Sequence, residues 1–358
     1  MTLSVAIVGC GKSAENHVTE IRRLGGARLT GVCDCEPLMA EQFSIRHDIS
    51  YWYSDFGQLL LELKPDVVHI TAPPQAHLNL ALQAIAAGCH VFVEKPLTEN
   101  TRQSEDLVRT ARANGCKLTV GWTYYFHPAL RAARKIVEQG LIGDLVHVEA
   151  FTAYDLQGNF GAAVLQDRTH WVHRLPGKLF QNNLDHSLAF VAEFIDPENC
   201  SLEVQAWRAT DSPYPELLDE LRVTIIGRRT SANLLFSCRA KPLGDSLVIT
   251  GSKGTLRVDL VNDIVTLAST SRLPGAFGRL AFAFDQTRQL ARQTLQNMVR
   301  FARSDFPPLP GLTFLTTEFY KCIESGEDIP ISDAQILRVC LMMERVVERI
   351  HEIKVMTA

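Results

Sequence analysis

A glycine-rich turn near the start of the chain has the residue types and spacing of a phosphate-binding loop. It follows an apolar run at residues 3–8 and precedes a stretch with helical periodicity. In a G-x-G-x-x-A pattern the first glycine permits a tight turn, the second lets backbone approach a diphosphate, and the alanine allows close helix–strand packing. A helix N-terminus behind such a turn attracts the diphosphate charge. The sequence therefore predicts a dinucleotide site formed by Gly9, Gly11, Lys12, Ser13 and Ala14.

An acidic residue closes the next predicted strand, at residues 29–33. This residue is Asp34, which stands 25 positions after Gly9. A carboxylate there accepts hydrogen bonds from ribose hydroxyls and repels a 2′-phosphate. We therefore expect NAD(H), with NADP(H) as the less favoured alternative.

A parallel sheet is needed to hold these residues together. Further strands are predicted at 66–70, 90–93 and 117–120, with helices at 76–87 and 101–114. Strands that alternate with helices of this length are typical of a doubly wound α/β sheet of Rossmann type. We assign this domain to residues 1–122.

The pattern changes after residue 122. Helical stretches at 128–139, 187–195 and 284–303 flank alternating runs at 221–226, 231–238, 246–250, 255–260 and 264–267. Turn residues between these runs favour an antiparallel or mixed sheet with one exposed face. We assign 123–358 to an α+β domain that binds substrate and forms oligomers. Its last helix, 333–353, opens with a capping box, and its apolar stripe indicates core packing, compatible with a return to the first domain.

Composition excludes several classes of protein. The 358 residues are 46% hydrophobic and 21% charged, with a net charge of −4, which is ordinary for a globular chain. This balance gives no case for nucleic acid or an anionic membrane as a partner. The nine cysteines form neither a zinc pattern nor a disulfide framework, so we predict no metal site and a cytoplasmic location. No run of 18 apolar residues occurs, so no spanning helix is expected.

Three later motifs carry a family resemblance. They are Thr71-Ala72-Pro73-Pro74-Gln75-Ala76-His77, Glu94-Lys95-Pro96 and Gly251-Ser252-Lys253-Gly254-Thr255-Leu256. With the first turn, they make the sequence resemble the Gfo/Idh/MocA (glucose–fructose oxidoreductase, inositol dehydrogenase, rhizopine catabolism) family over nearly its whole length. The resemblance implies a Rossmann domain, a C-terminal domain with a large open, mostly antiparallel sheet, and a homodimer or homotetramer formed through that sheet.

The resemblance also implies roles for residues of the first domain. Thr71, Pro73, His77, Glu94 and Lys95 would lie along the nicotinamide half of the cofactor. Lys95 would touch the hydroxyl being oxidised, where an ammonium stabilises a developing alkoxide. A plain surface lysine is the alternative.

In the second domain, the segment 177–186 matches a family motif with two departures. His186 aligns with the family histidine, but Asn182 stands where the family has aspartate and Leu184 where it has glycine. An amide can hydrogen-bond a hydroxyl but cannot accept its proton. Any general base must then be His186 or Lys95. A buried structural histidine at 186 is the alternative.

A basic segment at 168–178 precedes this motif. A sugar ring could stack on Trp171, while the arginines could hold a carboxylate or diphosphate; a solvated basic loop is the alternative. Tyr125 replaces an arginine that the family commonly shows before Phe-x-Pro. The predicted substrate contacts are Tyr125, Arg168, His170, Trp171, His173, Arg174, Asn182 and Asn183.

Together these features predict an NAD(H)-dependent oxidoreductase. Hydride would pass between nicotinamide and a secondary hydroxyl of a sugar, sugar nucleotide or cyclitol, an anionic one being compatible with the basic segment. Two alternatives stay open. One is a redox-neutral glycosidase or epimerase that oxidises its substrate transiently, and the other is a non-catalytic NAD-responsive binding protein.

Overall fold

The computed structural model describes residues 2–210, 214–269 and 274–353, which fall into two compact units. The first unit runs to Trp122 and includes 312–341, and the second comprises 123–311 and the residues from Met342 on. The sequence predicts one domain over 123–358, with a last helix (333–353) that could return to the first domain, and the structure moves 312–341 to the first unit. The difference arises because helix α11 (Pro310–Ser325) and the first half of α12 (Asp333–Glu352) pack on the first unit. The Phe319 ring, for example, meets that of Phe92 edge-on at 5.8 Å.

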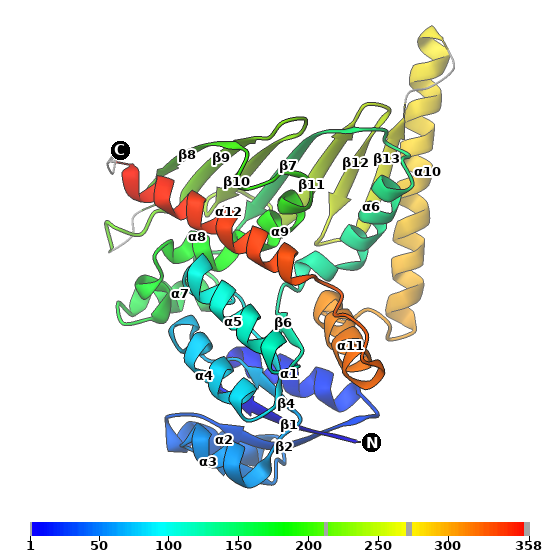
Figure 1. Cartoon of the computed structure of the whole chain (residues 1–358). Helices are drawn as coiled ribbons and strands as arrows, with labels where there is room; N and C mark the ends of the chain where they lie inside the picture. The colour runs from blue at the N-terminus through cyan, green and yellow to red at the C-terminus, as the bar shows by residue number, and fades with distance from the viewer. Residues whose placement is uncertain (1, 211–213, 270–273, 354–358) are drawn as a thin grey trace. The chain divides into compact units, whose positions relative to one another are not determined.

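The first unit contains a six-stranded sheet in which all pairs are parallel, in the order β3-β2-β1-β4-β5-β6. The predicted doubly wound sheet is thus confirmed (Figure 1). Its strands are β1 (Leu3–Val8), β2 (Ala27–Cys33), β3 (Tyr51–Tyr53), β4 (Val67–Ile70), β5 (His90–Val93) and β6 (Leu118–Val120). Its other helices are α1 (Lys12–Arg23), α2 (Pro37–Arg46), α3 (Phe56–Leu63), α4 (Pro74–Ala86) and α5 (Thr101–Ala113).

The strand order reverses between β1 and β4. From β1 the chain runs outward through β2 and β3, then returns to β4 on the other side of β1. In open parallel sheets ligands bind at the carboxyl ends of the strands beside such a switch point. The four residues of β4 are all buried, so the carboxyl end of this strand is fixed by core packing. The loops after β1 and β4 are therefore placed to meet a ligand.

The second unit contains a seven-stranded sheet in the order β13-β12-β11-β7-β10-β9-β8. Every neighbouring pair is antiparallel except β7 with β10. The predicted mostly antiparallel sheet is confirmed, but two of its strands, β7 and β8, were missed. The strands are β7 (Leu145–Ala153), β8 (Ser201–Trp207), β9 (Glu220–Ile226), β10 (Ser231–Ser237), β11 (Gly244–Gly251), β12 (Gly254–Asp259) and β13 (Ile264–Ser269).

Helices cover one face of this sheet, and the other face is open (Figure 1). On the covered face the Phe236 ring contacts Phe180 of α8 at 5.4 Å. The polar residues Glu149, Asn233 and Arg257 are exposed on the opposite face. The unit's helices are η1 (Tyr124–Phe126), α6 (Pro128–Glu138), α7 (Asn159–Gln166), η2 (Trp171–Arg174), α8 (Lys178–Asn183), α9 (Asp185–Phe194) and α10 (Gly275–Ala302). Across the described ranges, no helix combines the length and apolar character that spanning a membrane requires.

Candidate functional site

The turn after β1 admits only glycine at its first position. Gly9 has φ of +94°, and a Cβ built there would lie 2.4 Å from the backbone nitrogen of Ala72. The Thr71 hydroxyl donates to the Gly9 carbonyl at 2.6 Å, which fixes the two loops together. The turn after β1 is thus packed directly on the turn after β4, and Thr71 holds that contact.

The second glycine faces open space. Gly11 is exposed, and a Cβ at this position would meet no heavy atom within 4 Å. It is also the N-cap residue of α1, where no side chain caps the helix. Ala14 is fully buried, so α1 lies close to the sheet behind this opening. Uncapped amides beside open space at a helix N-terminus fit a diphosphate.

Asp34 lies beside the same turn, at the end of β2. Its Oδ2 accepts a hydrogen bond from the Cys10 amide at 2.8 Å, and its Oδ1 accepts one from the Glu36 amide at 3.0 Å. Two backbone donors therefore fix the orientation of this half-buried carboxylate. Each oxygen keeps a second lone pair for ribose hydroxyls. Lys12 is exposed and Ser13 half-buried at the start of α1, next to this group.

His77 lies inside the protein, where it joins two loops. It is fully buried, with Nε2 at 2.8 Å from the Ala72 carbonyl and Nδ1 at 2.9 Å from that of Pro96. Burial lowers the pKa of His77, although both carbonyls favour the protonated ring. The histidine links the segment after β4 to the segment after β5. The buried His77 therefore has a structural role in holding the two loops together. Pro73 in the first loop is exposed, and Lys95 in the second is half-buried.

A buried hydrogen-bonded chain leads to Glu94, and the sequence analysis missed it. His17 Nε2 lies 2.9 Å from the Glu94 carboxylate, His17 Nδ1 lies 2.7 Å from His69 Nδ1, and His69 Nε2 lies 2.9 Å from the Tyr320 hydroxyl. One set of tautomers satisfies all three contacts, with Tyr320 donating to His69, His69 to His17, and His17 to ionised Glu94. A histidine inside the apolar run Val67–Ile70 was the available signal.

The pKa shifts agree with that direction. Burial, with His17 beside it, lowers the pKa of His69 well below its ordinary value. Burial acts to raise the pKa of Glu94, but the hydrogen bond and charge of His17 and the charge of Lys95 outweigh it and leave that pKa lowered. Glu94 is therefore held as a carboxylate next to Lys95, whose own peptide bond to Pro96 is cis.

In the second unit, Asn182 and His186 share one helical face. Helix α8 ends one residue before α9 begins, and Leu184 between them keeps helical angles (φ −77°, ψ −20°). Residues four apart on such a path lie one above the other. Asn182 is buried, and the half-buried His186 ring lies 4.4 Å from the Tyr124 ring.

Asp245 of β11 is a second residue that the sequence analysis missed. It lines a small cavity together with Tyr124 and His186. Burial raises the pKa of Asp245 to about 6, with hydrogen bonds from Thr152 and Tyr124 acting against that rise. Burial and the Asp245 carboxyl in turn raise the pKa of Tyr124 to about 12. Asn182 occupies the position where the motif has an aspartate. A carboxyl group is nevertheless present nearby, because Asp245 bonds Tyr124 and the Tyr124 ring packs on His186.

Tyr125 takes part in internal packing. It is 8% exposed, and the Arg134 guanidinium lies 3.6 Å from its ring centre. Arg134 also donates to the Tyr125 carbonyl and to the Glu193 carboxylate, each at 2.7 Å. Burial raises the pKa of Tyr125, the Arg134 charge acts against that rise, and the Glu193 charge adds to it. We therefore leave Tyr125 out of the substrate site.

The basic segment forms an aromatic platform with cations beside it. The rings of His170 and Trp171 stack at 5.4 Å, and Phe160 meets both edge-on. Arg168 and Arg174 are exposed, and Arg168 lies 3.4 Å from the Glu216 carboxylate.

Two other predicted contacts have internal partners. His173 Nε2 bonds the Val164 carbonyl at 2.8 Å, and the Asn183 amide donates to the Leu179 carbonyl at 2.7 Å. These internal bonds leave His173 and Asn183 with fewer hydrogen-bonding groups for a sugar.

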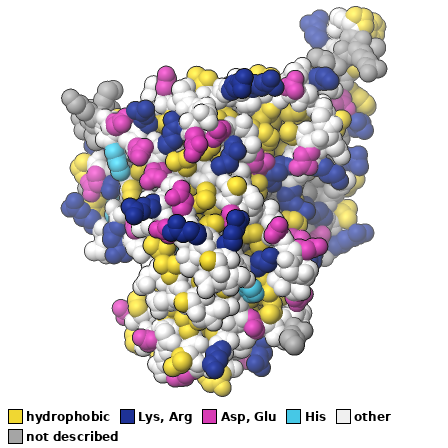
Figure 2. Space-filling model, viewed as in Figure 1, with side chains coloured by type: hydrophobic (Ala, Val, Ile, Leu, Met, Phe, Trp, Pro, Cys, Tyr) yellow, Lys and Arg dark blue, Asp and Glu magenta, His cyan; other side chains and the backbone are white. Residues whose placement is uncertain are grey.

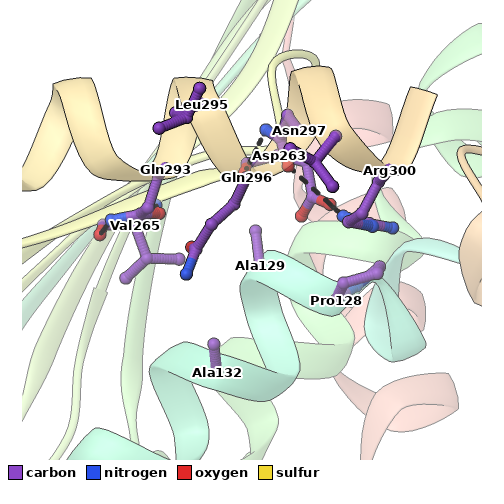
Figure 3. A pocket seen from close by; sticks show the side chains of 11 residues that line it. Pro128, Ala129, Ala132, Asp263, Val265, Gln293, Leu295, Gln296, Asn297 and Arg300 are labelled. Atoms are coloured by element: carbon purple, nitrogen blue, oxygen red, sulfur yellow. Dashed lines mark hydrogen bonds and ion pairs between the residues drawn. The ribbon is translucent and has the colours of Figure 1, made fainter. Parts of the chain in front are cut away.

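A separate groove of about 580 Å³ lies between α6, β13 and α10 (Figure 3). None of the predicted site residues lines it. Within the described ranges, no group of three or more His, Cys, Asp or Glu side chains could hold a metal ion.

Residues 3–122 match the family model described as "Oxidoreductase family, NAD-binding Rossmann fold" (GFO_IDH_MocA). The first domain of this chain is therefore similar to the NAD-binding domain of that family. Inositol 2-dehydrogenase of Ralstonia nicotianae is 31% identical over 146 residues, which are 40% of this chain and 43% of that protein. D-glucoside 3-dehydrogenase of Escherichia coli is 31% identical over 144 residues, or 40% and 41% of the two chains. The matches thus span less than half of these curated relatives.

Solved structures with low identity share the fold of the whole chain. The WlbA dehydrogenase of Bordetella pertussis, in complex with NADH and UDP-GlcNAcA, has a TM-score of 0.78 at 19% identity, covering 98% of this chain and 96% of that one. A levoglucosan dehydrogenase, in complex with NADH and levoglucosan, has a TM-score of 0.78 at 16% identity, covering 98% of both chains. At these identities the likeness shows a shared fold.

Proposed function

We propose that this protein is an NAD(H)-dependent dehydrogenase that acts on a secondary hydroxyl of a sugar, sugar nucleotide or cyclitol. The observation that carries the proposal is the geometry around Gly9, Gly11 and Asp34. A glycine with no room for a side chain, an open helix N-terminus and a fixed carboxylate occur together at the switch point of a parallel sheet. These are the requirements of a dinucleotide.

The first unit would hold the cofactor by its backbone. The diphosphate would accept hydrogen bonds at the N-terminus of α1, and Asp34 would accept them from the adenosine ribose. Because Asp34 would repel a 2′-phosphate, NAD(H) is preferred to NADP(H). When bound, the nicotinamide accepts or donates hydride at the substrate carbon.

Lys95 would stabilise the oxygen of the carbinol. Its ammonium follows directly after Glu94, which His17 holds as a carboxylate. That hydrogen bond on the neighbouring residue keeps the end of β5 in one conformation. An ammonium beside an alcohol lowers the cost of the alkoxide that forms as hydride leaves.

His186 would take the hydroxyl proton, and Asn182 would orient the hydroxyl. An imidazole is suited to accept a proton near neutral pH, whereas an amide can only hydrogen-bond. Their common helical face supports joint action on one carbinol. Tyr124, which packs on His186 and bonds Asp245, would set the orientation of the ring.

A carbohydrate is the substrate class that the surroundings of η2 favour. Trp171 offers a ring for stacking, and the exposed Arg168 and Arg174 offer donors for a carboxylate or phosphate. The names of the relatives point to cyclitols and glucosides, and WlbA was crystallised with an anionic sugar nucleotide. The predicted homodimer or homotetramer through the open sheet stays a prediction.

A substrate screen tests the proposal. The purified chain would be incubated with NAD⁺ and a panel of cyclitols, glucosides, sugar acids and nucleotide sugars while absorbance at 340 nm is recorded. We expect NADH formation with at least one member. Tightly retained cofactor and product formation with no net change at 340 nm would instead identify a redox-neutral enzyme. Failure to bind NADH at all would overturn the proposal.

A further inference from the structure

Helix α10 uses its polar face to cover the free edge of the sheet. Gln289 accepts from the Leu267 amide at 2.8 Å and donates to its carbonyl at 2.9 Å, while Gln293 accepts from the Val265 amide at 2.7 Å and donates to that residue's carbonyl. Asn297 adds bonds to the backbone just before β13. These side chains take the place of a neighbouring strand. An edge that would otherwise pair with other chains is therefore closed.

The opposite face of α10 is largely apolar, and among the described residues no other element covers it. Gly278 is the one buried residue of this helix. Six large apolar side chains of α10 are between 61% and 76% exposed: Phe277, Leu280, Phe284, Leu295, Met298 and Phe301. Gln293, Asn297 and Arg300 turn toward β13 and the loop before it, whereas Leu295 points away (Figure 3). Hydrophobic and basic side chains accordingly lie along the molecular edge that α10 occupies (Figure 2).

The stripe repeats every three and four residues over the whole helix. Its positions are Phe277, Leu280, Phe284, Thr287, Ala291, Thr294, Met298 and Phe301. That 3.5-residue period is the period of a two-helix seam. The hydroxyls of Thr287 and Thr294 donate to carbonyls four residues earlier, at 3.0 and 2.9 Å. They therefore need no hydrogen-bond acceptor on a second helix.

The side-chain sizes along the stripe are symmetric about its centre. If a second copy of α10 is laid antiparallel with its centre on the first, Phe277 meets Phe301 and Leu280 meets Met298. Phe284 then meets Thr294, and Thr287 meets Ala291. A two-fold axis makes each of these contacts twice. The stripe is therefore complementary to itself in one orientation.

We propose that two copies of this chain pair through α10, antiparallel about a two-fold axis. The five large side chains of the stripe, with Leu295 beside it, offer roughly 700 Å² of apolar surface per copy, close to the ~800 Å² per partner of a specific interface. Arg288 is paired with Asp285 at 3.0 Å and Arg300 with Asp263, and the further arginines Arg279 and Arg292 are exposed at positions outside the stripe. A lipid surface also accepts an apolar helix face, but it requires neither this period nor this symmetry.

A charge exchange across the seam tests the pairing. Sedimentation velocity would give the mass of the full-length wild type, Leu280→Lys, Met298→Glu and the double variant carrying both. Each single change should halve the mass of the wild-type assembly. The double variant should restore it, because position 280 of one copy then meets position 298 of the other with opposite charge. Both side chains are exposed on the single chain, and lysine and glutamate favour helix, so each variant should stay folded with the helix content of the wild type, as circular dichroism would measure.

Leu61→Lys, which adds a charge on an exposed apolar residue of α3, is the matched control and should leave the mass unchanged. A monomeric wild type at ~100 μM, unchanged masses in both single variants, or dissociation that the double variant does not reverse would each overturn the proposal. So would flotation of a monomeric wild type with phosphatidylcholine–phosphatidylserine vesicles that Leu280→Lys abolishes.

Discussion

The cofactor turn of the first unit and the Asn182–His186 segment of the second are stabilised by different kinds of contact. Around Gly9 the contacts are made mainly by backbone, as in the Cys10 amide bound to Asp34 and the Gly9 carbonyl bound to Thr71. Around His186 they are made by side chains from distant strands and turns, such as Tyr124 and Asp245. The turn has no room for a Cβ at Gly9, so its residue type is fixed by backbone geometry, whereas contacts between side chains can be made by other pairs of residues. This difference explains why the first region follows the expected motif closely and the second departs from it at Asn182 and Leu184.

The buried chain from Tyr320 to Glu94 belongs with the first region. It connects α11 to the end of β5 through two histidines. A fully buried hydrogen-bond chain fixes the position of its last member, because any loose member would lose a partner in a low-dielectric interior. Glu94, the residue before Lys95, is thus held in place by buried hydrogen-bond partners.

Removing the reacting ammonium should have the largest effect. We expect Lys95→Ala to lower kcat by roughly 10²- to 10⁴-fold, the usual contribution of a positioned acid or base, with the Kd for NADH little changed. Steady-state rates and calorimetry measure the two quantities. Lys253→Ala, at an exposed position in the turn before β12, serves as the control. Equal turnover in Lys95→Ala and wild type would remove Lys95 from the mechanism.

Adding a methyl group at the turn should affect the cofactor next. Gly9→Ala forces a Cβ to within 2.4 Å of Ala72 backbone at a φ of +94°, so we expect NADH binding to weaken by ~100-fold and Tm to fall by roughly 5 °C or more. Gly88→Ala is the matched control, since its φ is +83° but a Cβ there meets nothing within 4 Å. Gly88→Ala should lower Tm only through the strain of its positive φ and should leave NADH binding unchanged. Similar behaviour of the two variants would contradict the close packing of the two loops.

Removing the charge at the end of β2 should have a moderate effect. Asp34→Asn keeps the size of the side chain but loses the charged acceptor, so we expect NADH affinity to fall by about 10-fold and the preference over NADPH to shrink. Asp106→Asn, an exposed carboxylate on α5, should change neither. An unchanged NADH-to-NADPH ratio in Asp34→Asn would mean that another group selects the cofactor.

The smallest effect is expected at Asp245 and depends on pH. Its pKa rises from 3.8 in the unfolded chain to about 6 in the folded protein, so the folded state keeps a proton that the unfolded state has lost between these values. Stability should therefore fall as pH rises through this window. Asp245→Asn removes that loss, so its Tm should exceed the wild-type value by a few degrees more at pH 7.5 than at pH 4.5. Asp155→Asn, an exposed carboxylate, should show no such trend; a pH-independent difference for Asp245→Asn would contradict the account.

The sequence predicted the cofactor region better than the substrate region, for a physical reason. Glycine spacing and strand alternation report backbone geometry, so the turn, Asp34 and the parallel sheet could be read directly. The packing of Tyr125 on Arg134 and the approach of Asp245 to Tyr124 depend on contacts far apart in sequence. Neither contact produces a periodic pattern in the sequence. Strand β7 was missed for the same reason, and its position in the middle of the sheet is seen only from the strand pairing. His17 and His69 were missed because each histidine alone looks like an ordinary core residue.

Binding of nicotinamide nucleotides to the full chain tests the central claim most directly. Calorimetric titration of the wild type with NADH and with NADPH should give one site per chain, with NADH bound at least ~10-fold more tightly, as a fixed carboxylate at Asp34 requires. Absence of binding for both nucleotides would contradict the assignment of the Gly9–Gly11 turn, and tighter binding of NADPH would contradict the role of Asp34.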